Sequence, residues 1–226
     1  MPRRAVRKID PGLDFSRHLR KFDQLPDPWR SEAIFNREAP LEIEVGSGKG
    51  LFLLSAAAAA PERDFLGIEL AGKYARLAAS RLAKRGLTNA CIVEADAQRV
   101  VRERLPDGSL AAVHVYFPDP WWKARHKKRR IMTGAFLADV ERTLATGGRL
   151  HFWTDVEEYF ETTLEIVRGA TGLAGPFEVP ERPPEHDLDY RTNFERRMRL
   201  SGEPVYRAEF EKGSGFGVQG SLTPMA

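Results

Sequence analysis

The sequence predicts an α/β protein with a doubly wound, mostly parallel sheet of the Rossmann-like type, covered by helices on both faces in three layers. In the middle of the 226-residue chain, short runs of apolar, β-type residues alternate with longer segments of helical period. The apolar runs are nearly continuous, which is typical of parallel strands that are buried on both faces. A chain of this length is expected to form one such domain.

Strand and helix units follow one another along the chain. The expected strands, each bounded by glycine, proline or charge, are residues 41–45, 65–69, 90–94, 111–117 and 149–154. The helices expected between and after them are residues 51–60, 72–85, 97–104, 133–145 and 156–169. Gly147 and Gly148 predict a helix end and a turn into the fifth strand. Alternation over residues 205–210 predicts a further strand that joins the edge of the sheet.

The domain is expected to span residues 37–212. Residues 1–36 are predicted to be a flexible, basic N-terminal arm, which either supplies extra phosphate contacts or only solubilises the chain. Residues 213–226 are rich in glycine and are predicted to be a loose C-terminal tail. Prolines between residues 176 and 184 break the chain before the last strand.

Composition narrows the class of protein. Lys and Arg number 35 against 32 for Asp and Glu, a net charge of +3, so any nucleic-acid surface must be local. Cys91 is the only cysteine, which excludes an intramolecular disulfide and fits a reducing, cytoplasmic compartment. The longest apolar run, residues 51–60, is too short for a membrane span, and the basic start lacks the apolar stretch of a secretory signal. The histidines are scattered, so no metal site is expected.

A glycine-rich loop follows the first predicted strand and precedes a helix. Gly46, Gly48 and Gly50 let the backbone turn sharply and approach a ligand closely. Glu69 ends the second strand, where an acidic side chain can bind ribose hydroxyls of either a dinucleotide or S-adenosylmethionine. The GxGxG spacing, with a lysine inside it, favours S-adenosylmethionine. Glu44 favours it too, because a carboxylate suits a cationic sulfonium or amino group and repels a pyrophosphate.

Three further polar positions each have two interpretations that remain open from the sequence. Asp96, just past the third strand, can accept a hydrogen bond from an adenine amino group or cap the next helix. Asp155, directly after the fifth strand, is a site residue or a helix cap in the same way. Residues 192–195 have the spacing of a capping box and also belong to the same neighbourhood if the fold is right.

The most distinctive segment, residues 115–130, follows the fourth strand. Two prolines hold Asp119 on a restricted path at the carboxyl end of the strand, where open α/β sheets bind their ligands. Large aromatic residues beside Asp119 suit a planar base, and of the adjacent Trp121 and Trp122 we expect at least one to be functional. Six cations then follow among residues 123–130. Because they adjoin the carboxylate, nucleic-acid binding is favoured over a merely solvated helix face.

Together these stretches resemble the bacterial tRNA (guanine-N7-)-methyltransferase family, over residues 41–210. The resemblance is carried by residues 117–121 with the basic run after them, by the strand that ends at Glu69, by the Thr154-Asp155 pair and by residues 192–195. It implies a class I methyltransferase fold and transfer of the methyl group of S-adenosylmethionine to N7 of a guanine in the variable loop of tRNA. The implied partner is tRNA, met in the cytoplasm by a monomer or a homodimer.

The resemblance also implies a role for individual residues. Asp119 would be the catalytic residue. The cofactor would be bound by Glu44, Glu69, Asp96 and Asp119, together with Gly46 and Gly48 of the glycine loop. The guanine substrate would be contacted by Lys123, Asp155, Thr192, Asn193, Phe194 and Glu195. The tRNA would be contacted by Arg125, His126, Lys127, Lys128, Arg129 and Arg130.

Three alternatives compete with this interpretation. A methyltransferase that acts on an exocyclic amino group would also use a proline-bounded loop after the fourth strand. An NAD-dependent oxidoreductase is disfavoured by the loop spacing and by Glu44. A non-catalytic RNA-binding module would keep the basic run, but would have no need of the acidic residues.

Overall fold

The computed structural model describes residues 9–180 and 192–214, and its central part alternates strands and helices as predicted. The elements of this part are β2 (Leu41–Val45), α2 (Leu51–Ala59), β3 (Asp64–Glu69), α3 (Gly72–Lys84), β4 (Ala90–Glu94), α4 (Ala97–Glu103), β5 (Leu110–Tyr116), α5 (Gly134–Thr143), β6 (Leu144–Thr154) and α6 (Glu157–Ala170). Two further strands, β7 (Ala174–Phe177) and β8 (Tyr206–Glu211), flank helix α7 (Asn193–Leu200) in the chain.

The predicted end of α5 was wrong. The helix stops at Thr143, and Leu144 is extended, fully buried and paired with Leu110 of β5. Gly147 and Gly148, expected at the turn into the strand, lie within the range of β6 instead. Burial of Leu144 in the core thus decides the boundary. The left-handed φ of 75° at Gly147 lies where the pairing of β6 with β5 skips from Leu144 to Arg149.

The sheet has eight strands in the order β1-β4-β3-β2-β5-β6-β8-β7, with β1 formed by Leu19–Lys21. Strands β2 to β6 pair in parallel, and β8 is antiparallel to both β6 and β7, which confirms a doubly wound, mostly parallel fold. The chain leaves β2 on one side for β3 and later returns to the other side as β5. This switch point between β2 and β5 is where ligands of such sheets bind, outside the carboxyl ends of the strands.

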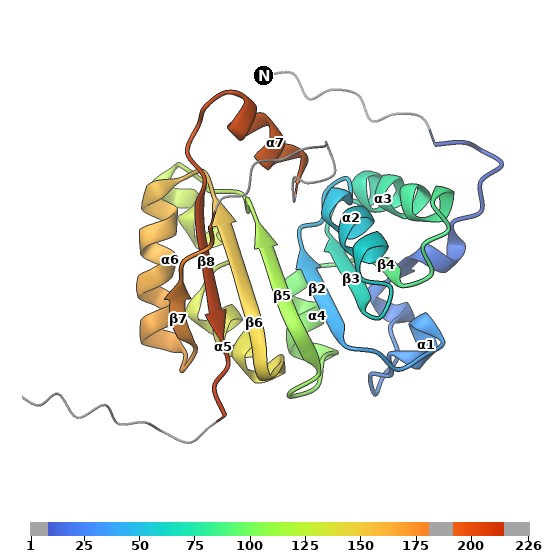
Figure 1. Cartoon of the computed structure of the whole chain (residues 1–226), viewed down its shortest axis with the longest axis horizontal. Coiled ribbons are helices and arrows are strands. Elements are labelled where there is room, and N and C mark those ends of the chain that lie inside the picture. The colour runs from blue at the N-terminus through green and yellow to red at the C-terminus, as the bar shows by residue number, and fades with distance from the viewer. Residues whose placement is uncertain (1–8, 181–191, 215–226) are drawn as a thin grey trace, which may run out of the picture.

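Alternation along the strands divides the core between the two faces of the sheet. On one face, Phe52 of α2 and Leu82 of α3 pack with Ile92 of β4. On the other face, residues of α4, α5 and α6 pack with Ile43 and Val45 of β2. Figure 1 shows that β5 and β6 point toward the end of the molecule where α7 lies, while β8 runs the opposite way.

The packed unit begins before residue 37, in contrast to the expected flexible arm. Strand β1 pairs in parallel with β4, and Phe22, Leu25 and Phe35 are buried in the core. The apolar side chains of this segment explain the difference, since they cover the sheet edge that β4 would otherwise leave open. Short helices η1 (Ser16–His18), η2 (Phe22–Gln24) and α1 (Glu32–Phe35) connect these contacts. Residues 1–8 of the arm and 215–226 of the tail lie outside the described residues.

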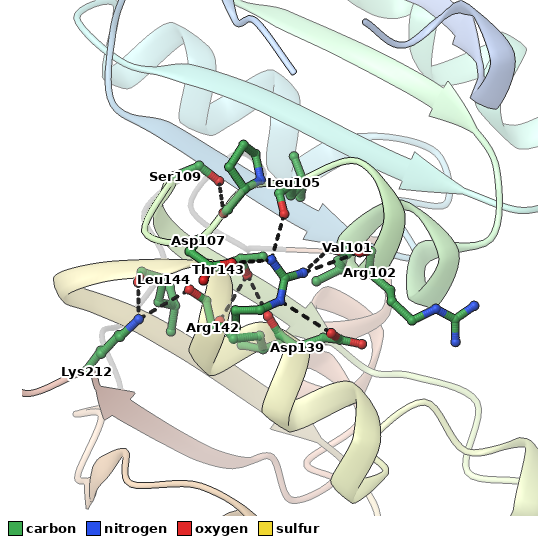
Figure 2. Close-up of polar contacts among 12 residues, drawn as sticks. Val101, Arg102, Leu105, Asp107, Ser109, Asp139, Arg142, Thr143, Leu144 and Lys212 are labelled. Carbon is green, nitrogen blue, oxygen red and sulfur yellow. Dashed lines mark hydrogen bonds and ion pairs between the residues drawn. The ribbon is translucent and has the colours of Figure 1, made fainter. Parts of the chain in front are cut away.

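A cluster of polar contacts joins the elements at the opposite end of the sheet from the switch point (Figure 2). Arg142, near the end of α5, donates from Nη2 to the carbonyl of Val101 at 2.9 Å and from Nη1 to Asp107 Oδ1 at 2.7 Å. Lys212, just after β8, donates to the carbonyl of Leu144 at 2.7 Å. These cations therefore satisfy carbonyl groups that helix ends leave without partners.

None of the helices placed within residues 9–180 and 192–214 is long and apolar enough to cross a membrane. Over the same ranges, no three His, Cys, Asp or Glu side chains are grouped in a way that could hold a metal ion.

Candidate active site

The glycine loop after β2 is shaped by left-handed backbone and by contacts with β3. Gly46, Gly48 and Gly50 have φ values of 76°, 53° and 70°. The Gly46 N–H donates to the carbonyl of Ile68 at 2.8 Å, and the Gly48 N–H donates to Glu69 Oε2 at 2.8 Å. A Cβ on Gly50 would come within 2.8 Å of Ala78 Cβ, whereas a Cβ on Gly46 would meet nothing within 4 Å. The space beside Gly46 is therefore open to a ligand.

Two carboxylates flank this loop. Glu44 of β2 is only 2% exposed, and its Oε2 is buried with no hydrogen-bond partner. Burial, with a smaller contribution from the charge of Glu69, raises the pKa of Glu44 to about 8, although the Ser47 hydroxyl acts in the opposite direction. Glu69 is held by the loop, because its Oε1 also accepts a hydrogen bond from the Ala71 N–H at 2.8 Å. A buried carboxylate without a partner is costly and suits a cationic ligand, so the residues present fit S-adenosylmethionine.

Asp96 is exposed after β4 and caps α4. Its Oδ1 accepts hydrogen bonds from the N–H groups of Gln98 at 2.8 Å and Arg99 at 3.4 Å. The capping interpretation is therefore confirmed. Contact of its other oxygen with the cofactor stays a prediction.

Asp119 lies in a loop that is held by its backbone. Phe117 and Trp121, at the two ends of the loop, have φ values of 50° and 46°. The Phe117 N–H donates to the carbonyl of Trp153 at 2.8 Å, and Arg130 Nε donates to the carbonyl of Pro120 at 2.8 Å. The Asp119 carboxylate is exposed and makes no hydrogen bond or ion pair with any residue in the described ranges. Its oxygens are thus left to a ligand.

The basic segment forms the short helix η3 (Ala124–Arg129) directly after this loop. Its exposed cations are Lys123, Arg125, Lys127, Lys128 and Arg129, and His126 is half-buried. Trp121 is half-buried, with the His126 ring edge-on at 5.7 Å and the Arg129 guanidinium 5.0 Å from its ring centre. Trp122 is 69% exposed. Arg130 differs from the other cations, because it is buried and its guanidinium is bound within the protein.

Helix α7 brings the other predicted substrate residues to the same edge of the sheet. Thr192 Oγ1 accepts a hydrogen bond from the Glu195 N–H at 3.0 Å and so caps the helix, which begins at Asn193. Glu195 is 2% exposed, with Oε1 lying 3.4 Å from Arg199 Nη1 and 3.7 Å from Arg207 Nη2. The ring of Phe194 packs 5.0 Å from that of Phe117. The contact with Phe117 places α7 against the Asp119 loop.

Asp155 follows β6 directly and is half-buried. Burial raises the pKa of its carboxyl above the ordinary value, with Glu203 acting in the same direction and Arg197 against it. The carboxyl ends of β2 to β6 therefore gather Glu44, Glu69, Asp119 and Asp155 on one edge of the sheet, as the sequence predicted.

Two residues of this edge were not predicted from the sequence. Glu158, on the first turn of α6, pairs with Arg130 and Lys127, each at 2.7 Å. Arg207 of β8 lies over the Trp153 ring at 5.0 Å and beside Glu195. Glu158 was detectable only as an acidic residue three positions after Asp155, and Arg207 carries no local signal.

This strand order, with a glycine loop after β2 and acidic residues at the ends of β2 and β3, defines a class I methyltransferase that uses S-adenosylmethionine. A family model described as "Putative methyltransferase" matches residues 38–208. The chain is 48% identical to a tRNA (guanine-N(7)-)-methyltransferase of Rhodopirellula baltica, over 95% of this chain and 81% of the relative. It is 40% identical to one of Stutzerimonas stutzeri, over 89% and 81%. The chain belongs to the tRNA (guanine-N(7)-)-methyltransferase family.

Solved structures agree on the fold. The 16S rRNA methyltransferase KamB superposes with a TM-score of 0.61 at 17% identity, covering 81% of this chain and 92% of that one. An antibiotic-related methyltransferase superposes with a TM-score of 0.60 at 15% identity, covering 78% and 90%. At these identities the likeness supports the class I methyltransferase fold alone.

Proposed function

We propose that this protein transfers the methyl group of S-adenosylmethionine to N7 of a guanine in the variable loop of tRNA. The observation that carries the proposal is the exposed, unpaired carboxylate of Asp119 among the described residues. It stands between an acidic cofactor site and a cationic segment on one edge of the sheet. The names of the curated relatives support the choice of tRNA and of guanine N7.

On the cofactor side, Glu44 and Glu69 provide carboxylates for the cationic and ribose parts of S-adenosylmethionine, beside the open space at Gly46. The hydrogen bond from the Gly48 N–H to Glu69 holds the glycine loop in its conformation. Asp96 has one carboxylate oxygen left for the adenine amino group after capping α4. When bound, the cofactor supplies a methyl group on an activated sulfonium.

On the substrate side, Asp119 accepts hydrogen bonds from the Watson-Crick edge of guanine and so directs N7 toward the methyl carbon. The lone pair of N7 forms the new bond as the carbon-sulfur bond breaks, and the electron pair goes to sulfur. No base has to remove a proton first. The carboxylate also offsets the positive charge that the base gains. Positioning is therefore the main task, and it can contribute roughly 7 to 11 kcal/mol.

The remaining predicted substrate residues divide by exposure. Lys123 is exposed and Asp155 half-buried beside the same loop, so both can reach the nucleotide. Among the described residues the Thr192 hydroxyl only accepts, from the Glu195 N–H, so its hydrogen can serve a substrate. Asn193, Phe194 and Glu195 belong to the same helix, where buried Glu195 ties α7 to β8 by its ion pair with Arg207.

The cationic segment is assigned to the tRNA backbone. Arg125, Lys128 and Arg129 are exposed on η3 and suit phosphate contacts, as do His126 and Lys127 beside them. Trp122, 69% exposed among these cations, offers a ring on which an unpaired base can stack. Because the substrate is tRNA, we infer a cytoplasmic location, with the monomer or the homodimer as the active form.

The test is methyl transfer from labelled S-adenosylmethionine to unmodified bulk tRNA, followed by nucleoside analysis. N7-methylguanosine is the expected product. Asp119→Asn should lower kcat by about 100-fold or more, because the uncharged amide cannot accept both hydrogen bonds or offset the developing charge, while cofactor affinity should fall far less than kcat. Asp107→Asn, an exposed carboxylate at the opposite end of the sheet, is the matched control.

Each competing function gives a different result. An exocyclic N-methylated base would mean an amino-methyltransferase, and binding of NAD in place of S-adenosylmethionine would mean an oxidoreductase. Tight tRNA binding with no transfer would leave an RNA-binding module. Full kcat in Asp119→Asn would overturn the role of Asp119 even if the product is N7-methylguanosine.

A further inference from the structure

The Asp119 loop begins and ends in backbone conformations that need support. Phe117 and Trp121 both have left-handed φ values, and a residue with a Cβ pays roughly 1 to 2 kcal/mol for this region. Such conformations persist only where the surroundings hold them. At its start the loop is held by the sheet, through the Phe117 N–H and the Trp153 carbonyl at 2.8 Å. At its end the hydrogen bond from Arg130 to Pro120 holds it.

Arg130 makes this second contact from a buried position. Its side chain is 7% exposed, and Nε donates to the Pro120 carbonyl at 2.8 Å. Nη1 and Nη2 donate to Glu158 Oε1 and Oε2 at 3.2 and 2.7 Å, a two-point contact with helix α6. The guanidinium also lies 4.4 Å from the ring centre of Tyr159. Arg129, one residue earlier, is exposed over Trp121 instead.

Glu158 is suited to hold a buried cation. The hydrogen bonds from Arg130 and Lys127 lower its pKa to about 2, so it is ionised over the whole working range of pH. The ion pair offsets the cost of burying the guanidinium, and it leaves Nε free to bind the loop. Arg130 thus links α6 to the peptide that follows Asp119 directly.

We infer that Arg130 is a positioning residue for catalysis, which fixes the carboxylate of Asp119 by tying the Pro120 carbonyl to Glu158, and that it does not contact tRNA. The inference rests on the proposed role of Asp119. It separates Arg130 from the exposed cations of the same basic run, although the sequence places them side by side. A displacement of about 1 Å at a reacting group can cost about 100-fold in rate, so a loose loop would lower turnover without affecting tRNA affinity.

The experiment compares Arg130→Lys with Arg129→Lys and Arg129→Gln. Lysine keeps the charge of Arg130 but cannot reach Pro120 and both oxygens of Glu158 at once. Arg130→Lys should lower kcat by about 10- to 100-fold at saturating tRNA. The KM for tRNA and the dependence of tRNA binding on salt should stay within two-fold of wild type. Arg129→Gln should show the opposite pattern, with KM raised more than kcat is lowered. Arg129→Lys, which keeps the phosphate charge, should restore KM.

Four further measurements separate positioning from loss of structure. Cofactor affinity and thermal unfolding check that Arg130→Lys is folded, and Glu158→Gln weakens the same anchor while Arg130 stays in place. In the double variant with Asp119→Asn, Arg130→Lys should add almost nothing to the loss of kcat, because both act through the same carboxylate. Independent, additive losses would overturn the inference. So would a kcat within two-fold of wild type, or a shallower salt dependence in Arg130→Lys.

Different results would reject the role of Arg130 and the proposed function. The identity of the base methylated by the wild-type enzyme tests the proposed function alone. The salt dependence of tRNA binding needs no turnover, and the coupling between Arg130 and Asp119 is read from whatever base is methylated. Two-fold or smaller loss in both Arg130→Lys and Glu158→Gln would reject the positioning role under either product.

Discussion

At the scale of single residues, Glu44 is a carboxylate whose burial is unfavourable in the free protein and suits the binding of a cation. The side chain lies on the face of the sheet that α2 covers, and its Oε2 has no partner. Burial raises its pKa to about 8, so in the absence of a cation the neutral form is preferred near pH 7. A cationic ligand would reverse this preference. The site therefore couples cofactor binding to loss of a proton.

This coupling predicts how stability depends on pH. Between the unfolded pKa of 4.5 and the folded pKa of about 8, the folded protein holds a proton that the unfolded chain has lost. The contribution of Glu44 to stability is therefore present below this window and declines as pH rises through it, by up to about 1.4 kcal/mol per pH unit. Glu44→Gln should remove the decline. Denaturant unfolding of both proteins without cofactor, from pH 5 to 9, measures the difference.

The control is the same series with saturating S-adenosylmethionine. Wild type should then lose its decline at high pH, whereas Glu44→Gln should bind the cofactor more weakly at every pH. Parallel stability curves for the two proteins without cofactor would show that Glu44 titrates as an ordinary carboxyl.

Residue roles were predictable where the chemistry is local. Asp119 lies between two prolines at the end of a strand, and both features can be recognised from the sequence alone. Arg130 is different, because its burial depends on Glu158 and Tyr159, which lie on a helix almost thirty positions later. Glu195 likewise depends on Arg207 of a strand that follows it. Local spacing contains no information on such partners.

At the scale of elements, the cation Arg142 of α5 supplies hydrogen-bond donors for carbonyl groups at the end of the neighbouring helix α4. It lies in the last turn of α5 and reaches the carbonyls of Val101 and Leu105 at the end of α4, as well as Asp107. Figure 2 shows its guanidinium pointing into the group of carbonyls between the two helices. Because α4 and α5 pack side by side on the sheet, this contact fixes the carboxyl end of one against the other.

Arg142→Met should therefore lower the free energy of unfolding by about 1 to 3 kcal/mol, since partly buried carbonyls lose their donor. Arg102→Met is the matched control, because Arg102 is exposed and pairs only with Glu103 at 3.3 Å among described side chains. It should change stability by no more than about 0.5 kcal/mol. Denaturant unfolding measures both. Equal stability of the two variants would contradict a capping role, and cofactor affinity should be unchanged in each.

Elements with a continuous apolar pattern were predicted to within one or two residues, as β2 to β5 illustrate. Those outside that pattern were not. Strand β1 is three residues with two cations, and it exists because β4 offers an edge to pair with. Strand β7 contains a Gly-Pro pair, and all four of its residues are exposed. Helix α7 is highly charged, and its only signal in the sequence is the N-cap at Thr192. Tertiary pairing decides these elements, so their local sequence cannot reveal them.

At the scale of the whole molecule, charge is nearly balanced but unevenly placed. The net charge is +3, while the run of residues 123–130 holds six cations beside the Asp119 loop. Glu158 neutralises Arg130 and pairs with Lys127, which leaves Lys123, Arg125, Lys128 and Arg129 as the exposed cations without an ion pair in the described part of this run. Attraction for a polyanion should therefore depend on where cations lie and not on their total.

A triple variant, Arg125→Gln with Lys128→Gln and Arg129→Gln, tests this arrangement. Each phosphate contact contributes roughly 0.7 to 0.9 to the slope of log K against log salt concentration, so the slope for tRNA should become shallower by about 2 to 3. The matched control replaces the exposed cations Lys84, Arg85 and Arg168, at or near the ends of α3 and α6, by Gln. It changes the net charge by the same three units at the opposite end of the sheet, and its slope should match that of wild type. Titrations of tRNA at constant pH, from about 50 to about 300 mM salt, compare the three proteins.

Equal flattening of the slope in both triple variants would mean that net charge alone governs the attraction. The basic segment would then be no more than a solvated helix face.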